Sequence, residues 1–269
     1  MMKLKRTAKP TGSKKISVAR RGETTGSAAD FVPPNPTLPK LRAAAVGCRG
    51  CHLWKVGTQT VFGEGPRSAR VVVVGEQPGD QEDKQGRPFV GPAGRLLDHA
   101  FDAAGIERDD VYVTNAVKHF KWARDARTKR RLHKTPNAGE VRACFPWLEN
   151  ELNLIKPQVV VCLGATAAKA LLGRTFSVTK SRGIPVETRW APVAIATVHP
   201  SSVLRAPADA RKRAEAAFLA DIRKVARVLA SASTSEGRRS RTSRRFGAWP
   251  TTIETPSAPS SALTRSSRR

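Results

Sequence analysis

Two short stretches of this 269-residue chain carry the side chains that acid–base or nucleophilic chemistry requires. The first, VGEQPGDQEDKQGRPFVGPAG (74–94), places Glu76 and Asp80 among five glycines and three prolines, so backbone N–H groups of a compact loop can face a ligand. The second, TKRRLHK (128–134), places His133 in a basic, turn-rich segment. A carboxylate can stabilise a developing cation, and a neutral imidazole can attack it. His133 could therefore react, contact a phosphate or hold a loop.

The glycine-rich loop is not a standard nucleotide-binding motif. It contains neither GKS/GKT nor GxGxxG, so a nucleoside triphosphate or dinucleotide site is unsupported. Phe89, an aromatic residue among turn formers, favours a pocket in which a base stacks. The alternative is an ordinary strand-to-helix connection with solvated carboxylates.

Four cysteines provide a candidate metal site. Cys48 and Cys51 form a C-x2-C pair, and Cys144 and Cys162 follow far along the chain. Zinc sites with four cysteines usually show two close pairs, whereas scattered thiolates with one close pair also suit an iron–sulfur cubane. Cys162 lies in an apolar run and could instead be a core residue. The spacing alone leaves the metal open.

Strand and helix patterns alternate through the middle of the chain. Continuous apolar runs predict strands covered on both faces, and the segments between them show helical periodicity. The predicted strands are RVVVV (70–74), VYVTNAV (111–117), PQVVVCLG (157–164) and PVAIATVHP (192–200). This order predicts a three-layer α/β/α sandwich around a mostly parallel, four-stranded sheet. Ligands of such sheets bind beyond the carboxyl ends of the strands, which are followed here by polar, glycine-rich or histidine-bearing segments.

Charge and composition divide the chain into a folded middle and two basic tails. Residues 1–40 carry a net charge of +7 and residues 231–269 carry +6, which leaves +13 of the total +26 on the middle. We expect disordered tails at 1–39 and 231–269 and one domain over 40–230. The basic domain points to a polyanionic partner, although charge alone also fits solubility or nonspecific RNA contact.

Neither a membrane span nor a signal peptide is expected, because no apolar run approaches ~20 residues and the N-terminus lacks an apolar core. We expect a cytoplasmic, nucleoid-associated protein. In that reducing compartment disulfides are not expected.

The combined motifs resemble one family. The loop GEQPGDQEDKQGRPFVGPAG, Asn115 in VTNAV, the four cysteines and HPSSVLR (199–205) are similar to the family 4 uracil-DNA glycosylases, which are iron–sulfur proteins. The resemblance covers roughly residues 40–230. Gln77 and the loop KRRLHK depart from family 4 and resemble its UdgX subgroup, whose members capture uracil-DNA covalently through the loop histidine. Leu132 stands where that loop usually has isoleucine.

The resemblance implies a role for each candidate residue. Phe89 would stack on a uracil flipped out of DNA, the Asn115 amide would read its edge, and Gln77 and His199 would lie at its O2 atom. Glu76 and Asp80 would supply negative charge beside the sugar cation, and His133 would capture that cation. The remaining implied sites are DNA contacts at Lys129, Arg130, Arg131, Lys134, Ser201 and Arg205, and a [4Fe–4S] cluster on Cys48, Cys51, Cys144 and Cys162.

The expected partner is uracil-containing DNA, with single strands preferred, and the expected state is a monomer. Two alternatives stay open at this point. One is an ordinary family 4 enzyme that turns over with water as nucleophile. The other is a metal-containing protein that binds DNA lesions without chemistry.

Overall fold

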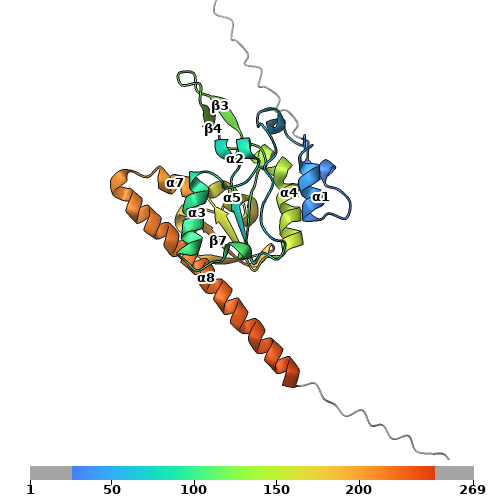
Figure 1. The fold of residues 1–269 in the computed structure, drawn as a ribbon, viewed down its shortest axis with the longest axis vertical. Helices are drawn as coiled ribbons and strands as arrows, with labels where there is room; N and C mark the ends of the chain where they lie inside the picture. The colour runs from blue at the N-terminus through green and yellow to red at the C-terminus, as the bar shows by residue number, and fades with distance from the viewer. Residues whose placement is uncertain (1–25, 246–269) are drawn as a thin grey trace, which may run out of the picture.

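The computed structural model describes residues 26–245, which form three layers: a sheet with helices on both faces (Figure 1). The elements in chain order are η1 (Ala28–Phe31), α1 (Leu38–Ala45), η2 (His52–Lys55), β1 (Val71–Gly75), α2 (Asp80–Gln85), α3 (Pro92–Asp102), η3 (Arg108–Asp110), β2 (Val111–Asn115), β3 (Trp122–Arg124), β4 (Arg131–His133), α4 (Ala138–Ile155), β5 (Val159–Leu163), α5 (Ala165–Leu172), α6 (Val178–Ser181), β6 (Pro185–Thr188), β7 (Ala191–Thr197), α7 (Pro200–Leu204) and α8 (Ala208–Arg245).

The main sheet has the strand order β2-β1-β5-β7-β6. The four predicted strands are present and parallel, which confirms the three-layer α/β/α prediction. The strand count of four was wrong, because β6 pairs antiparallel with β7 at the sheet edge. Only one face of β6 is covered, so its residues alternate between exposed and half-buried. Such a short alternating strand lacks the continuous apolar run that marked the other four.

The two faces of the sheet have separate cores. On one face, α3, α7 and α8 cover residues such as Val71, Val113 and Ile195. On the other face, α4 and α5 cover Val72 and Cys162. Alternate residues of each strand thus enter different cores, as the two-residue period of a strand requires.

A third apolar cluster lies on the outer side of α4 and joins it to the N-terminal segment. It includes Ala28 of η1, Leu41 of α1 and Trp147 of α4. Ala28 is fully buried, so packing begins within the segment expected to be a tail ending at residue 39. The run FVPPNPTLP hid this contact, because its proline-rich composition is also typical of disorder.

Two features extend from the sandwich. The hairpin β3–β4 projects beyond the carboxyl ends of the parallel strands, and α8 runs past the opposite end (Figure 1). The bounds of α8 reach Arg245, so part of the segment expected to be disordered from residue 231 is helical. The tail predictions for residues 1–25 and 246–269 lie outside the described residues. Within the described part, no helix combines the length and apolarity needed to cross a membrane.

Candidate active site

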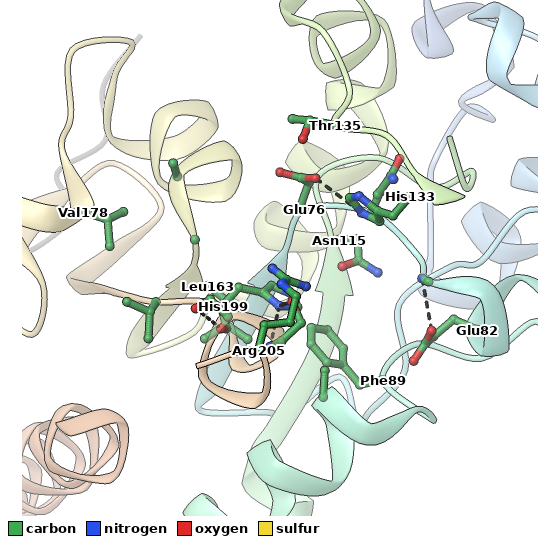
Figure 2. Close-up of a pocket in the computed structure, with 18 of the residues that line it drawn as sticks. Glu76, Glu82, Phe89, Asn115, His133, Thr135, Leu163, Val178, His199 and Arg205 are labelled. Carbon is green, nitrogen blue, oxygen red and sulfur yellow. Dashed lines mark hydrogen bonds and ion pairs between the residues drawn. The ribbon is translucent and has the colours of Figure 1, made fainter. Parts of the chain in front are cut away.

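A cleft of about 730 Å³ opens at the carboxyl ends of the parallel strands (Figure 2). Eight predicted site residues line it: Glu76, Gln77, Phe89, Asn115, His133, His199, Ser201 and Arg205. The parallel register explains their convergence, because Gly75 pairs with Asn115 and Leu163 with Thr197 at one edge of the sheet. The other predicted catalytic and DNA-contacting residues, Asp80, Lys129, Arg130, Arg131 and Lys134, are not among the residues that line the cleft.

Glu76 is a carboxylate that lines the cleft beside His133 (Figure 2). Its Oε1 lies 3.5 Å from Nε2 of His133, and its Oε2 accepts a hydrogen bond from the hydroxyl of Thr166 on α5. Burial lowers the pKa of His133, and Arg205 lowers it further while Glu76 opposes both effects. The imidazole is therefore neutral near pH 7, which is the nucleophilic form. Sequence reasoning missed Thr166, whose only signal was its place at the start of the helix that follows a parallel strand.

Asn115 and Phe89 form the inner wall of the cleft. Asn115 is buried, yet its side-chain amide makes no hydrogen bond within the described part of the chain. An amide offers both donors and an acceptor, so this one is available to a polar ligand edge. Gly75 allows both side chains to approach, since a Cβ there would lie 2.3 Å from Asn115 Oδ1 and 2.8 Å from the Phe89 ring.

His199 stacks near Phe89, with ring centroids 6.2 Å apart and planes 22° from parallel. Burial lowers its pKa to about 4, with smaller contributions from His133 and Arg205, so the ring is neutral. The backbone N–H of Ser201 donates to His199 Nδ1 at 3.2 Å. A neutral ring that accepts at Nδ1 carries its proton on Nε2. His199 therefore has a hydrogen-bond donor at Nε2.

Glu82 fixes the glycine-rich loop from behind. Its two carboxylate oxygens accept from the backbone N–H groups of Gly79, at 3.1 Å, and Gly91, at 2.8 Å. Both Glu76 and Glu82 line the cleft, but the Glu82 carboxylate is bound by the loop backbone and acts as a structural brace.

Gln77 lines the cleft, but its side chain bonds to the hairpin. Its side chain accepts from Lys121 N at 3.0 Å and donates to Lys121 O at 3.2 Å and to Lys134 O at 3.1 Å. These atoms flank β3 and β4, so the amide joins both ends of the hairpin that carries His133. The hydrogen-bonding groups of the side chain thus have protein partners, so a contact with the uracil O2 atom would have to come from the Gln77 backbone N–H.

The predictions for Arg131 and Asp80 are corrected, because these two residues bond to each other. Arg131 Nε lies 2.5 Å from Asp80 Oδ1, and its Nη1 lies 2.6 Å from Oδ2 of the buried Asp83. The guanidinium also lies over the ring of Trp122. Burial alone would raise the pKa of Asp80, but hydrogen bonds from Lys84 and Arg131 bring it below its ordinary value. Arg131 thus anchors the hairpin to α2 instead of facing a phosphate.

The other predicted hairpin cations, Lys129, Arg130 and Lys134, are exposed. Lys129 has a positive φ of 58° at the hairpin turn. All three side chains are exposed, so a nucleic-acid backbone can reach them.

Three of the four cysteines share one apolar cluster. Cys48, Cys51 and Cys144 are buried together, whereas Cys162 lies in the core on the far side of α4. The prediction that Cys162 is a metal ligand is therefore corrected: Cys162 is a core residue, because its place on β5 directs it toward α5. Trp147 Nε1 donates to Cys48 Sγ at 3.3 Å, and Lys118 N donates to Cys144 Sγ at 3.2 Å. Among the described residues, no three His, Cys, Asp or Glu side chains are arranged to hold a metal ion.

A buried ion pair missed by sequence reasoning connects this cluster to the cleft. Lys118 Nζ lies 2.6 Å from Glu151 Oε2, with both side chains fully buried, and also donates to the carbonyl of Asn115 at 2.9 Å. Tyr112 donates to the same carboxylate at 2.9 Å. The network fixes the backbone of Asn115, and no local pattern marks it because the partners are distant in sequence.

Comparison with known proteins agrees with the fold and the cleft. Residues 62–223 match the family described as "Uracil DNA glycosylase superfamily", and the chain belongs to this superfamily. Within it the chain is similar to "Type-4 uracil-DNA glycosylase" of Thermotoga maritima, 42% identical over 59% of this chain and 78% of the relative. Proteins of the same description from Sulfurisphaera tokodaii (35% identical, 64% of this chain and 77% of the relative) and Pyrobaculum aerophilum (38%, 64% and 86%) also match. These relatives place the chain in the type-4 branch.

Proposed function

We propose that this protein is a uracil-DNA glycosylase that removes uracil from DNA and then becomes attached to the DNA sugar through His133. The removal rests on family membership together with a cleft that holds Glu76, Asn115 and His199. The observation that carries the attachment is the pairing of a neutral, half-exposed imidazole with Glu76 Oε1 at 3.5 Å inside that cleft. The histidine is thus beside the carboxylate that would face the sugar.

Base recognition would use three side chains. The flipped uracil would stack on Phe89, while the Asn115 amide would accept from N3–H and donate to O4. Cytosine has a donor where uracil has O4 and lacks the N3 proton, so both bonds would be lost. His199 would donate from Nε2 to O2, because Ser201 already donates to its Nδ1. That bond would strengthen as negative charge develops on the leaving base.

Bond cleavage would send the electron pair of the glycosidic bond to uracil N1 and leave a cation at C1′. Glu76, held by the Thr166 hydroxyl, would stabilise this cation electrostatically. A lone pair of the His133 ring would then form a bond to C1′. The ring would release its other N–H proton, which neutralises the uracil anion, so the products are free uracil and a DNA–histidine adduct.

The test is incubation with single-stranded DNA containing one uracil, followed by a denaturing gel. The wild-type protein should give a slow band that survives SDS and heat. His133→Ser should release uracil and leave alkali-labile DNA without that band, because the serine leaves room for water at C1′. A wild-type band that dissociates in SDS, or cross-linking by His133→Ser, would overturn the proposal; alkali-labile DNA from the wild type would then identify a turning-over enzyme that uses water.

We also propose a [4Fe–4S] cluster near the N-terminal segment. Cys48, Cys51 and Cys144 would hold it, and N–H donors already face two of these sulfurs, as is common around iron–sulfur clusters. A fourth ligand would have to come from a residue other than Cys162. His119 is the first to test, because it follows Lys118, is buried, and has its pKa lowered to about 4 by that burial. Bound here, outside the cleft lining, the cluster would supply structural stability.

Four further features belong to the proposal. Lys129, Arg130 and Lys134 would contact phosphates from the hairpin, and Ser201 and Arg205 from the cleft. Single-stranded DNA would be preferred, since no base pair has to be broken before flipping. The protein would act as a monomer. Its place would be the cytoplasm, in association with the nucleoid.

A further inference from the structure

Arg182 lines the cleft and directly follows helix α6. Val178, the first residue of α6, is on the far side of the cleft from Phe89 and His133 (Figure 2). Arg182 itself lines the cleft, and its side chain is 31% exposed. The predicted DNA contacts did not include it, because nothing in the segment TKSRGIP distinguishes this arginine from other surface cations.

A buried carboxylate orients the guanidinium of Arg182. Its Nε donates to Asp221 Oδ2 at 2.9 Å, and its buried Nη2 lies 2.8 Å from the same oxygen. Asp221, on α8, is 5% exposed and also accepts from the Thr197 hydroxyl at 2.7 Å. Nη2 is close to Asp221 but makes no hydrogen bond, and because Nε and Nη2 both lie at Asp221, Nη1 is the nitrogen that remains for a ligand. No hydrogen bond to Nη1 occurs within the described part of the chain.

The surrounding backbone is adapted to this arrangement. Gly183 has φ +67°, and a Cβ there would lie 2.1 Å from Asp221 Oδ1. Its N–H donates to Ala196 O at 2.7 Å, which fixes the segment against β7. A side chain at residue 183 would displace Asp221 and release Arg182. The arginine is therefore held by several elements at once.

The local charge does not cancel. Lys224 Nζ lies 3.4 Å from Asp221 Oδ1, so two cations share one carboxylate. A pair that served only to join α6 to α8 would be complete with one cation. Arg182 lines the same cleft as Ser201 and Arg205. An anion entering the cleft would meet a preorganised donor there.

We infer that Arg182 binds a DNA phosphodiester through Nη1, on the opposite side of the flipped nucleotide from the hairpin. The strand would then be held at two separate phosphates, one near Lys129, Arg130 and Lys134 and one at Arg182. Asp221 acts as a positioning residue that keeps the guanidinium fork in place. This inference rests on DNA being the substrate and is independent of capture by His133.

The test measures equilibrium binding without reaction. A fluorescein-labelled single strand carrying one 2′-fluoroarabino-uracil nucleotide serves as the probe, because the fluorine disfavours the sugar cation and keeps the base in place. Arg182→Gln should raise the Kd roughly tenfold and lower the slope of log Kd against log salt by about 0.7, the loss of one single-strand phosphate contact. Arg189→Gln is the matched control. Arg189 pairs with Glu149 and precedes β7, at the opposite end of the sheet, so its loss should change neither quantity.

A second measurement separates binding from folding. Methylphosphonates that neutralise single phosphates near the uracil should include one that weakens wild-type binding about tenfold and leaves Arg182→Gln binding unchanged. If Arg182→Gln does not fold, Arg182→Lys should show a reduced effect at the same phosphate, since one lysine nitrogen cannot pair with Asp221 and also take the place of Nη1. Wild-type Kd and slope in folded Arg182→Gln, with only a lower Tm, would show a purely structural ion pair. An undiminished methylphosphonate effect at every position would overturn the inference equally. Failure of the wild type to cross-link DNA would leave these binding results unaffected.

Discussion

Replacing Gln77 with alanine would test whether the hairpin must be held in place for capture. The side chain is 6% exposed and makes three hydrogen bonds to the main chain at Lys121 and Lys134. Alanine removes all three without touching Glu76, Asn115 or His133. Uracil release should persist, while attachment to DNA should become slower.

The size of the effect follows from the bonds lost and the anchors that remain. Three hydrogen bonds at ~0.5–1.5 kcal/mol each give roughly 1.5–4.5 kcal/mol. The hairpin keeps the ion pairs of Arg131 and the bond from Trp122 Nε1 to Val56 O at 2.8 Å. We therefore expect the lower end, about 2 kcal/mol, which corresponds to roughly thirtyfold slower capture at 1.4 kcal/mol per factor of ten.

The assay follows both events in the same quenched samples. Free uracil is measured by chromatography, and the adduct is measured as the slow band on a denaturing gel. Gln81→Ala is the matched control, because Gln81 is an exposed glutamine of the same loop. Equal slowing of release and capture would mean that Gln77 acts on uracil, as the sequence resemblance implied. Capture at the wild-type rate would mean that the three hydrogen bonds of Gln77 are not needed to hold the hairpin.

Two further predictions concern the thiols and the imidazole. Cys162→Ala should keep the brown colour and the absorption near ~400 nm of anaerobically purified protein, whereas Cys144→Ala should lose both; equal loss in both variants would restore Cys162 as a ligand. Because the pKa of His133 lies below its ordinary value, capture should persist below pH 6.5 and fail only as the ring protonates. Arg205→Gln removes one cause of the lowered pKa, so the acidic limb of the plot of capture rate against pH should move to higher pH. An unmoved limb would contradict the reasoning.

The part of the site that could be predicted from sequence lies on the parallel strands. Glu76, Asn115 and His199 each follow a continuous apolar run, and the carboxyl ends of parallel strands meet at one edge. Their convergence therefore needed only the strand order of an α/β fold. The unbonded amide of Asn115 is consistent with the role that the resemblance implied.

The errors concern side chains whose partners are distant in sequence. Arg131 looks like any exposed arginine until Asp80 and Asp83, on α2, are brought under the hairpin. Cys162 could be a ligand or a core residue by spacing, and only the packing of β5 against α5 decides its surroundings. Gln77 differs again, because its partners are backbone atoms that no sequence pattern reveals.

The anchoring of the hairpin has a consequence for protein engineering. A two-stranded hairpin of three-residue strands is too small to be stable alone, so it needs its docking points. Much of that docking comes from the short segment 77–83, through Gln77, Asp80 and Asp83. A glycosylase that turns over would therefore need both segments, 77–83 and 121–134, grafted together to become a reagent that labels uracil sites permanently. Grafting segment 121–134 by itself would leave the hairpin without the hydrogen bonds of Gln77 and without the ion pairs to Asp80 and Asp83.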